Sequence, residues 1–275
     1  MHWNPEEKNI IHYVEFLSNL YTIGLSYNTI NTARSAFSSV FGKVDNVPIG
    51  ENKLIVDLMK GISRLRPVTP RYNITWDPDK VLLFLKSILI ETCSLKDLSF
   101  KLIGLLALCT GQRVQTLTNI KLSNIHWGET VQIIISSKLK TTTVTKSNPI
   151  LIIPPFHDSQ LCPVKTLKQY VESTKVIRNG CDELFISFVK PHKKVCSQSI
   201  SRWLVKLLKL AGIEDAFKAH SFRHASTSKA ARNGVNMDVI LRRVGWTVNS
   251  SVFARFYNRP VLDESEFAVN VLNIK

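Results

Sequence analysis

The sequence predicts a mainly α-helical protein with a small antiparallel β-sheet (α+β), divided into a small N-terminal helical domain and a larger second domain. Apolar residues recur at helical spacing over most of the 275 residues. Two β-branched runs, 131–136 and 149–154, enclose a Thr-rich turn and predict a hairpin. The stretch RLRPVTPRYN (64–73) has two prolines and three arginines and marks the division. The expected parts are residues 1–66, a basic proline-containing linker at 67–75, and residues 76–275.

Three amphipathic helices are expected in the N-terminal domain. The first spans about 4–22, with Asn4 as its cap. The second opens at Ser26 or Asn28, and the third spans 53–63. The outward side chains of the second helix suit phosphate and groove contacts, and a solvated helix surface explains them equally well. These side chains are Tyr27, Asn28, Thr29, Asn31, Thr32 and Arg34.

The linker is both stiff and basic. A segment that wraps a duplex would need its prolines and its arginines Arg64, Arg66 and Arg71, whereas a plain tether would need only the prolines. After the linker, Asp77 and Pro78 supply the cap and the first position of a helix.

A helix buried on all sides is predicted from the apolar run Leu102 to Cys109, which Gly111 ends. Arg113 follows at the opening of another short helix. An arginine in this position is costly unless it faces a cleft or an anionic partner, although it can also bond nearby carbonyl groups.

The predicted hairpin carries a basic turn, SKLKTTTVTKSN. Its tip could enter a minor groove or approach a scissile phosphate, and a solvated basic turn is the plain alternative. Beyond it we expect a helix at 163–176, a short strand at 184–188 and a helix at 199–211 that presents Lys206.

The stretch from His220 to Tyr257 reads as three short helices. His220 and Arg223 are three residues apart at the start of the first helix, so they can face the same way. Trp246 follows a helix-ending glycine, and Tyr257 lies on the third helix between Arg255 and Arg259. Each of these residues alone is more often structural than catalytic; their order carries the information.

Composition favours a nucleic-acid partner. The net charge is +15, and residues 76–275 carry 28 Lys+Arg against 15 Asp+Glu, whereas residues 1–75 carry 8 against 6. No long apolar run or basic amphipathic helix supports a membrane partner. Five scattered cysteines without a C-x-x-C pair or a secretory signal predict an intracellular protein. The seven histidines include no H-E-x-x-H, so no metal or other cofactor is expected.

The phrase TGQRVQTLTNI, followed in order by HSFRHASTSKA, GW and SSVFARFYNRP, resembles the tyrosine recombinases of the phage-integrase and Xer-type superfamily. The wording is most similar to recombinases of DIRS-type and related mobile elements, although the gap from Trp246 to Tyr257 is slightly longer than usual. The resemblance implies a helical core-binding (SAM-like) DNA-binding domain and a catalytic domain with a C-terminal tail. It also implies metal-independent DNA strand transfer, with Tyr257 as the nucleophile that forms a 3′-phosphotyrosyl link.

The other catalytic residues that the resemblance implies are Arg113, Lys140, His220, Arg223 and Trp246, with Lys138 and Lys146 as rivals of Lys140. The expected DNA-binding residues are Arg34, Arg64, Arg66, Arg71, Lys138, Lys146 and Lys206. The implied partner is double-stranded DNA, on which the chain would assemble as a dimer or tetramer through a tail at 262–275. A domesticated relative that binds DNA without cutting it and a type IB topoisomerase are the alternatives. The expected location is the nucleus in a eukaryote, or otherwise the cytoplasm and nucleoid.

Overall fold

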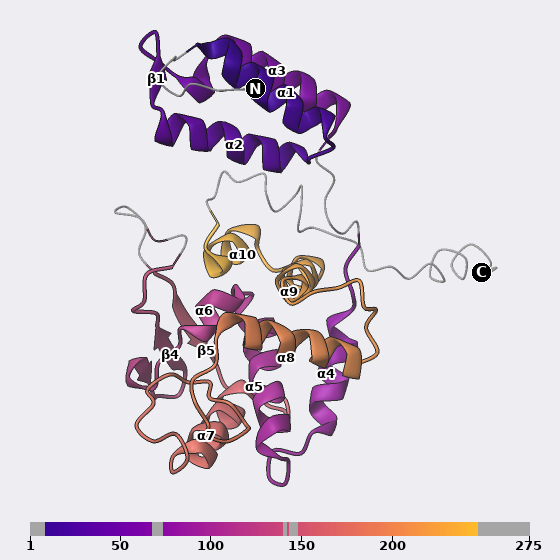
Figure 1. Cartoon of the computed structure of the whole chain (residues 1–275). Helices are drawn as coiled ribbons and strands as arrows, with labels where there is room; N and C mark the ends of the chain where they lie inside the picture. The colour runs from indigo at the N-terminus through magenta and orange to yellow at the C-terminus, as the bar shows by residue number, and fades with distance from the viewer. Residues whose placement is uncertain (1–8, 68–73, 140–141, 143–147, 247–275) are drawn as a thin grey trace, which may run out of the picture. The chain divides into compact units, whose positions relative to one another are not determined.

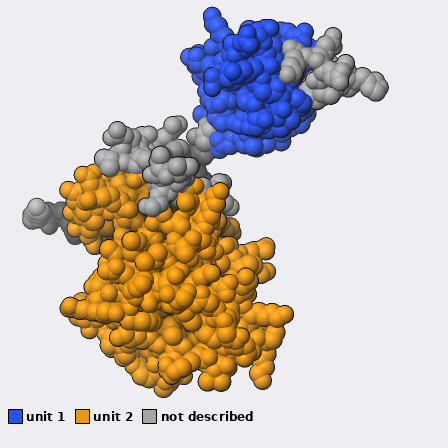
Figure 2. All heavy atoms as spheres, turned by 90° about the vertical axis from the view of Figure 1, so that its left-hand side faces the viewer, with its two compact units in different colours: residues 1–71 blue, residues 72–275 orange. Residues whose placement is uncertain are grey.

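The computed structural model describes residues 9–67, 74–139, 142 and 148–246 (Figure 1). The chain divides into two compact units, residues 1–71 and 72–275 (Figure 2). Most described residues lie in helices, and the strands form one two-stranded and one three-stranded antiparallel sheet, which confirms the predicted mainly α class. No helix in the described part of the chain is both long and apolar enough to cross a membrane.

Unit 1 is a three-helix domain with a small hairpin. Its elements are α1 (Ile10–Thr22), α2 (Tyr27–Val40), β1 (Lys43–Val44), β2 (Val47–Pro48), the 3-10 helix η1 (Ile49–Glu51) and α3 (Lys53–Leu65). Its core contains Tyr13, Leu17, Ile30, Ile49, Ile55 and Met59. The prediction that α1 begins near residue 4 is wrong, because Asn9 is extended and its side chain caps the helix by accepting the N–H of Ile11 at 3.0 Å.

The β1–β2 hairpin was not expected, although its turn has a sequence signal. Asp45 and Asn46 both have positive φ, 49° and 64°, as the tight turn of a two-residue hairpin requires. Asp and Asn tolerate this backbone region better than other non-glycine residues. A two-residue strand is too short to show period-2 alternation, so the hydrophobic pattern alone could not find it.

Unit 2 contains the remaining elements. They are α4 (Pro78–Ser87), α5 (Leu95–Thr110), α6 (Val114–Thr118), η2 (Leu122–Asn124), β3 (Ile125–His126), β4 (Val131–Ile134), β5 (Ile150–Ile153), α7 (Pro163–Thr174), α8 (Ser197–Leu210), α9 (Ser221–Arg232) and α10 (Met237–Val244).

Helix α5 is the centre of unit 2, as the apolar run predicted. It packs against α4, α6, α7, α8, α9 and strand β5 (Figure 1). Every residue from Leu98 to Ala107 is buried. Gly104 allows α8 to come close, because a Cβ at this position would lie 2.5 Å from Leu207 Cδ2. The helix ends at Gly111, whose left-handed φ of 59° turns the chain toward Arg113.

The three-stranded sheet has the order β3-β4-β5, with Ile134 opposite Ile150. Val131 and Ile133 alternate inward with outward Gln132 and Ile134, so one face joins the core. The prediction of a strand at 184–188 is wrong: within the described residues this segment forms only one isolated bridge, Ile186 with Lys194, and the preceding Glu183 bridges Lys121.

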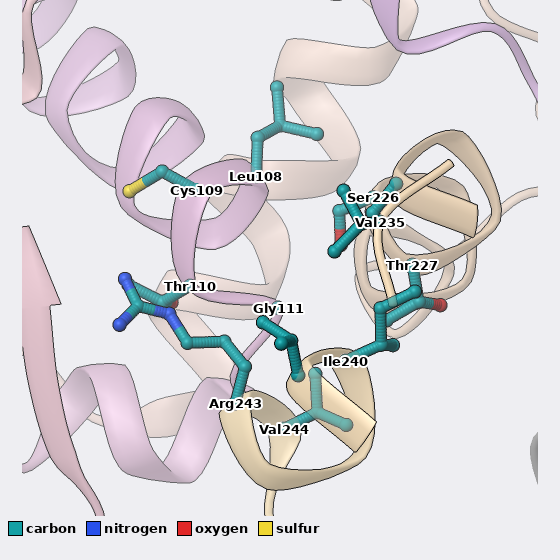
Figure 3. Close-up of a pocket in the computed structure, with 12 residues that line it drawn as sticks. Leu108, Cys109, Thr110, Gly111, Ser226, Thr227, Val235, Ile240, Arg243 and Val244 are labelled. Atoms are coloured by element: carbon teal, nitrogen blue, oxygen red, sulfur yellow. The ribbon is translucent and has the colours of Figure 1, made fainter. Parts of the chain in front are cut away.

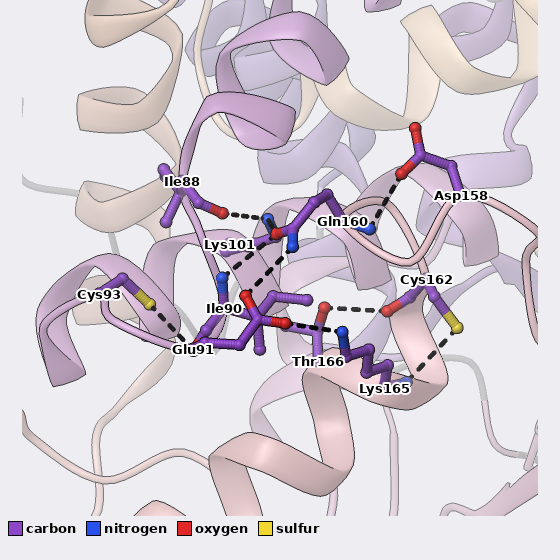
Figure 4. A network of polar contacts seen from close by, with 10 residues as sticks. All are labelled: Ile88, Ile90, Glu91, Cys93, Lys101, Asp158, Gln160, Cys162, Lys165 and Thr166. Atoms are coloured by element: carbon purple, nitrogen blue, oxygen red, sulfur yellow. Dashed lines mark hydrogen bonds and ion pairs between the residues drawn. The ribbon is translucent and has the colours of Figure 1, made fainter.

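A buried lysine holds the turn between α4 and α5 (Figure 4). Lys101, on α5, donates through Nζ to the carbonyl oxygen of Leu85 at 2.8 Å and also to that of Ile88, so its ammonium group caps the end of α4. Its burial lowers the pKa of Lys101. Nearby, Lys165 bonds Glu91 at 2.7 Å, and this contact lowers the pKa of the Glu91 carboxyl to about 2.

Candidate active site

Arg223 joins three segments that are far apart in the sequence. It lies in the first turn of α9 and is 1% exposed. Its Nη1 donates to the carbonyl oxygen of Gly111 at 2.9 Å, and its Nη2 donates to that of Val244 at 2.7 Å. The guanidinium therefore fixes both the turn before Arg113 and the turn before Trp246.

Trp246 lies in a loop after α10, as its position behind a glycine predicted. Gly245 ends α10 with a φ of 72°, and the backbone N–H of Trp246 donates to the carbonyl oxygen of Leu241 at 2.8 Å. The guanidinium carbon of Arg223 lies 4.4 Å from the centre of the Trp246 ring, a cation–π contact. The two predicted residues thus form one unit.

Arg113 is half-buried at the N-terminus of α6 and is held through its neighbours. Gln112 donates through Nε2 to the carbonyl oxygen of Arg243 at 2.8 Å, and a Cβ at Gly111 would lie 2.8 Å from Val244 Cγ1. Among the described residues, the guanidinium of Arg113 makes no hydrogen bond or ion pair, so its donors are open to a ligand.

His220 precedes α9 and is exposed. Its ring meets that of His224 edge-on, with centroids 5.1 Å apart and an interplanar angle of 83°. His224 is 8% exposed, so a buried ring supports an exposed one. This contact leaves the His220 ring at the surface of the same helix start that carries Arg223.

A basic groove of about 650 Å³ runs along α8 and reaches His220. Its lining residues are Gln198, Ser201, Arg202, Val205, Lys206, Lys209, Lys218, Ala219 and His220. Lys209 pairs with Asp215 at 2.7 Å, whereas Lys206 is exposed and makes no ion pair within the described part of the chain. The groove offers cations beside the candidate site.

A second hollow, of about 100 Å³, lies where the end of α5 meets α9 and α10 (Figure 3). Leu108, Val235 and Ile240 line it, and its lining is mostly apolar. Arg243, at its edge, donates to the carbonyl oxygen of Ile152 and so ties α10 to β5. The hollow is too small and too apolar to hold a nucleotide.

The other predicted residues have different surroundings. Arg66 donates to the carbonyl oxygens of Leu25 and Tyr21 and lies 4.3 Å from the Tyr21 ring, so it closes the end of α1. Arg34 donates to the carbonyl oxygen of Gly50 at 3.3 Å. Arg64 and Lys138 are exposed. The predicted residues outside the described part of the chain are Arg71, Lys140, Lys146 and Tyr257.

The sequence did not identify the groups that hold the site. The carbonyl oxygens of Gly111 and Val244 fix Arg223, and the side chains of Trp76 and Ser221 meet at the start of α9. Gly111, the glycine in TGQR, was the one sequence signal for these groups, because it marks the turn whose carbonyl oxygen holds Arg223. In the described residues, no cluster of three or more His, Cys, Asp or Glu side chains could hold a metal ion.

Solved structures with the same fold include DNA-bound recombinases. The XerH site-specific recombinase bound to a palindromic difH substrate matches with a TM-score of 0.64 and 19% identity, over 97% of this chain and 73% of that chain. The Tn1549 transposon integrase in complex with transposon right end DNA matches with a TM-score of 0.62 and 17% identity, over 98% and 87%. A λ integrase dimer bound to a COC′ core site matches with a TM-score of 0.55 and 16% identity, over 94% and 83%.

No curated protein sequence matches the chain. The pattern of the phage integrase family, however, matches residues 84–261. This span contains Arg113, His220, Arg223, Trp246 and Tyr257, and it covers well over half of the chain. The protein is therefore a member of the phage integrase family.

Proposed function

We propose that the protein is a site-specific DNA recombinase that cleaves and rejoins strands through a 3′-phosphotyrosyl intermediate. The observation that carries this proposal is the meeting of three motif segments at Arg223, in a chain of the phage integrase family. The DNA ligands named for the XerH, Tn1549 and λ integrase structures support the same substrate class. The wording of the HSFRH and SSVFARFYNRP segments further suggests an origin in a DIRS-type or related mobile element.

The chemistry divides among the predicted residues. Tyr257 attacks the phosphorus, and Arg113 and Arg223 stabilise the charge that develops on the non-bridging oxygens. His220 bonds the same phosphate or moves the proton of the nucleophile. Trp246 donates one N–H, and Lys140 protonates the leaving 5′ oxygen. Because the 3′-phosphotyrosyl bond keeps the phosphodiester energy, another 5′-hydroxyl can resolve it without ATP or a metal.

Arg223 and Trp246 must act together in this scheme. The Arg223 side chain is 1% exposed and its guanidinium carbon lies 4.4 Å from the centre of the Trp246 ring, so a phosphate bound at Arg223 would contact the indole as well. The groove along α8, with Lys206, would hold the flanking duplex. We also propose that the chain assembles on DNA as a dimer or tetramer and that its tail, residues 262–275, docks on a neighbouring protomer.

The nucleophile can be tested on DNA that the protein itself selects. Duplexes are first recovered by repeated binding from a random-sequence library. A set of the selected duplexes is then prepared, each with a single nick beside a different phosphate. Cleavage next to the nick releases a short fragment that cannot rejoin, so the protein stays trapped on the DNA. The parent chain should form a covalent adduct that survives denaturation, and Tyr257→Phe should bind the duplex but form none, because the ring has lost its attacking oxygen.

Each other outcome has a defined meaning. An adduct with Tyr257→Phe contradicts the assignment of the nucleophile. Binding without any adduct by the parent chain identifies a DNA-binding relative that does not cut. Relaxation of supercoiled plasmid that lacks the selected sequence identifies a topoisomerase instead.

A further inference from the structure

We infer that Trp76 and Ser221 form a positioning pair that sets the start of α9 and thereby the directions of His220 and Arg223. The inference rests on the proposed strand cleavage. Neither residue is expected to touch the reacting phosphate.

The two residues meet inside unit 2 although 145 positions separate them. The indole N–H of Trp76 donates to Ser221 Oγ at 2.8 Å, and the two residues are 4% and 1% exposed. The same indole meets the Phe222 ring edge-on, with centroids 5.0 Å apart. Ser221 and Phe222 are the two residues between His220 and Arg223. Trp76 therefore contacts both residues that lie between His220 and Arg223.

No side chain caps the start of α9, so backbone bonds and contacts with other elements set its direction. The first N–H groups of a helix have no partner within the helix, and a Ser, Thr, Asp or Asn cap usually fixes them. Here the cap position is His220, which has helical φ and ψ and makes no side-chain capping bond in the described structure. The N–H groups of Ser221 and Phe222 bond the carbonyl oxygens of Lys218 and Ala219 at 2.8 and 3.3 Å, and the bond from Trp76 ties the Ser221 side chain to another part of unit 2.

A second side-chain contact, between α4 and α9, is weaker than the Trp76–Ser221 bond. Lys229 pairs with Asp79, but their side chains are 28% and 57% exposed. Exposed ion pairs add little, and salt screens them. Loss of the Trp76 bond, in contrast, leaves a buried donor or acceptor without a partner. The Trp76–Ser221 bond is thus the stronger of these two contacts, and it acts on the first turn of α9 together with the bonds of Arg223 to Gly111 and Val244.

The spectroscopic test uses the indole groups as reporters. The chain contains five tryptophans, and with 5-fluorotryptophan each gives a fluorine NMR signal that Trp→Phe variants assign. Trp246 lies on Arg223, so its signal reports the position of that guanidinium. Ser221→Ala should shift the Trp246 signal. Trp203→Phe, a change at a buried indole packed against Phe100 and Phe188, should leave it in place.

The kinetic test uses the nicked duplex selected as above. At saturating protein, Ser221→Ala should slow adduct formation about tenfold or more with little change in DNA affinity, because small displacements of catalytic groups cost large factors in rate. Trp203→Phe should cleave at the parental rate. If Ser221→Ala does not fold, Trp76→Phe serves as the test variant in its place, because it removes the donor of the same hydrogen bond.

The double variant Trp76→Phe/Ser221→Ala separates positioning from stability. It removes both partners, so no buried group is left unpaired, and the urea midpoint should recover toward the parental value. Cleavage should stay slow and the Trp246 signal shifted. An unshifted Trp246 signal in Ser221→Ala, or a parental rate in the double variant, overturns the inference. If the signal shifts while the parent chain forms no adduct, the proposed function fails and the positioning contact stands.

Discussion

Buried cations in unit 2 are held by backbone carbonyl oxygens. Arg223 bonds those of Gly111 and Val244, and Lys101 bonds those of Leu85 and Ile88. Arg178, 7% exposed, does the same for the turn after α7, where it bonds the carbonyl oxygens of Cys181 and Glu183 at 3.2 and 2.9 Å. Carbonyl groups at helix ends lack partners within the helix, so a cation placed there fixes the geometry of the turn.

Lys101 gives a prediction for pH dependence. Burial lowers its pKa below the ordinary value of 10.5, so between the two pKa values the unfolded chain binds more protons than the folded chain. The free energy of unfolding of unit 2 should therefore rise as the pH increases through this window. Lys101→Met should abolish that rise, and at pH 7 it should lower the stability by about 1–3 kcal/mol, because two carbonyl groups lose their donor.

Urea unfolding between pH 7 and 10.5 measures both effects. Lys96→Met is the matched control, since Lys96 is an exposed lysine in the first turn of the same helix. It should leave the pH profile unchanged. If Lys101→Met keeps the parental profile, the alkaline rise comes from another group.

Among the elements, α5 and α8 approach each other closely at Gly104. Gly104 faces Leu207, which is fully buried, and Leu85 of α4. Because interiors are close-packed, Leu207 has no free space into which it could move. Gly61 of α3 is the opposite case, since a Cβ there would meet nothing within 4 Å.

The two glycines predict opposite effects of one substitution. Alanine is favoured over glycine in a helix by about 1 kcal/mol. Gly61→Ala should therefore raise the thermal stability of unit 1. At Gly104 the new methyl would lie 2.5 Å from Leu207 Cδ2 and 3.1 Å from Leu85 Cδ1, and overpacking of about 1–3 kcal/mol should outweigh the propensity gain. Calorimetry on both variants checks the signs; stabilisation by Gly104→Ala would mean that α8 moves away.

Over the whole molecule, the distribution of charge matches the proposed partner. The net charge of +15 comes mostly from residues 76–275, and the α8 groove places Arg202 and Lys206 beside His220. Attraction between such a surface and phosphates falls as salt rises, because binding releases counterions from the DNA.

Lys206 should contribute to this salt dependence. Lys206→Ala should weaken binding to the selected duplex and reduce the slope of log K against log salt by about 1, since one phosphate contact is lost. Lys165→Ala is the control, because Lys165 lies on α7 and pairs with Glu91. Equal slopes for the parent and Lys206→Ala, measured by fluorescence anisotropy, would remove Lys206 from the DNA surface.

Short-range signals in the sequence determined most helix boundaries in this protein. Asp77 caps α4 with Pro78 behind it, Ser26 caps α2, and Gly111 and Gly245 end α5 and α10 with positive φ. A cap or a stop acts over a few residues, so its chemistry is visible locally. Each site motif is likewise a short stretch of residues, so the motifs and their order could be read from the sequence.

Only the tertiary structure decided how the site residues are held. The partner of Arg223 at Gly111 lies 112 positions away, and Trp76 meets Ser221 across 145. No local pattern marks a carbonyl group as the ligand of a distant cation, or an indole as the support of another helix. The failure of the 184–188 strand depended equally on competition among groups. These outcomes follow from packing, where the whole unit selects one partner among many that the sequence permits.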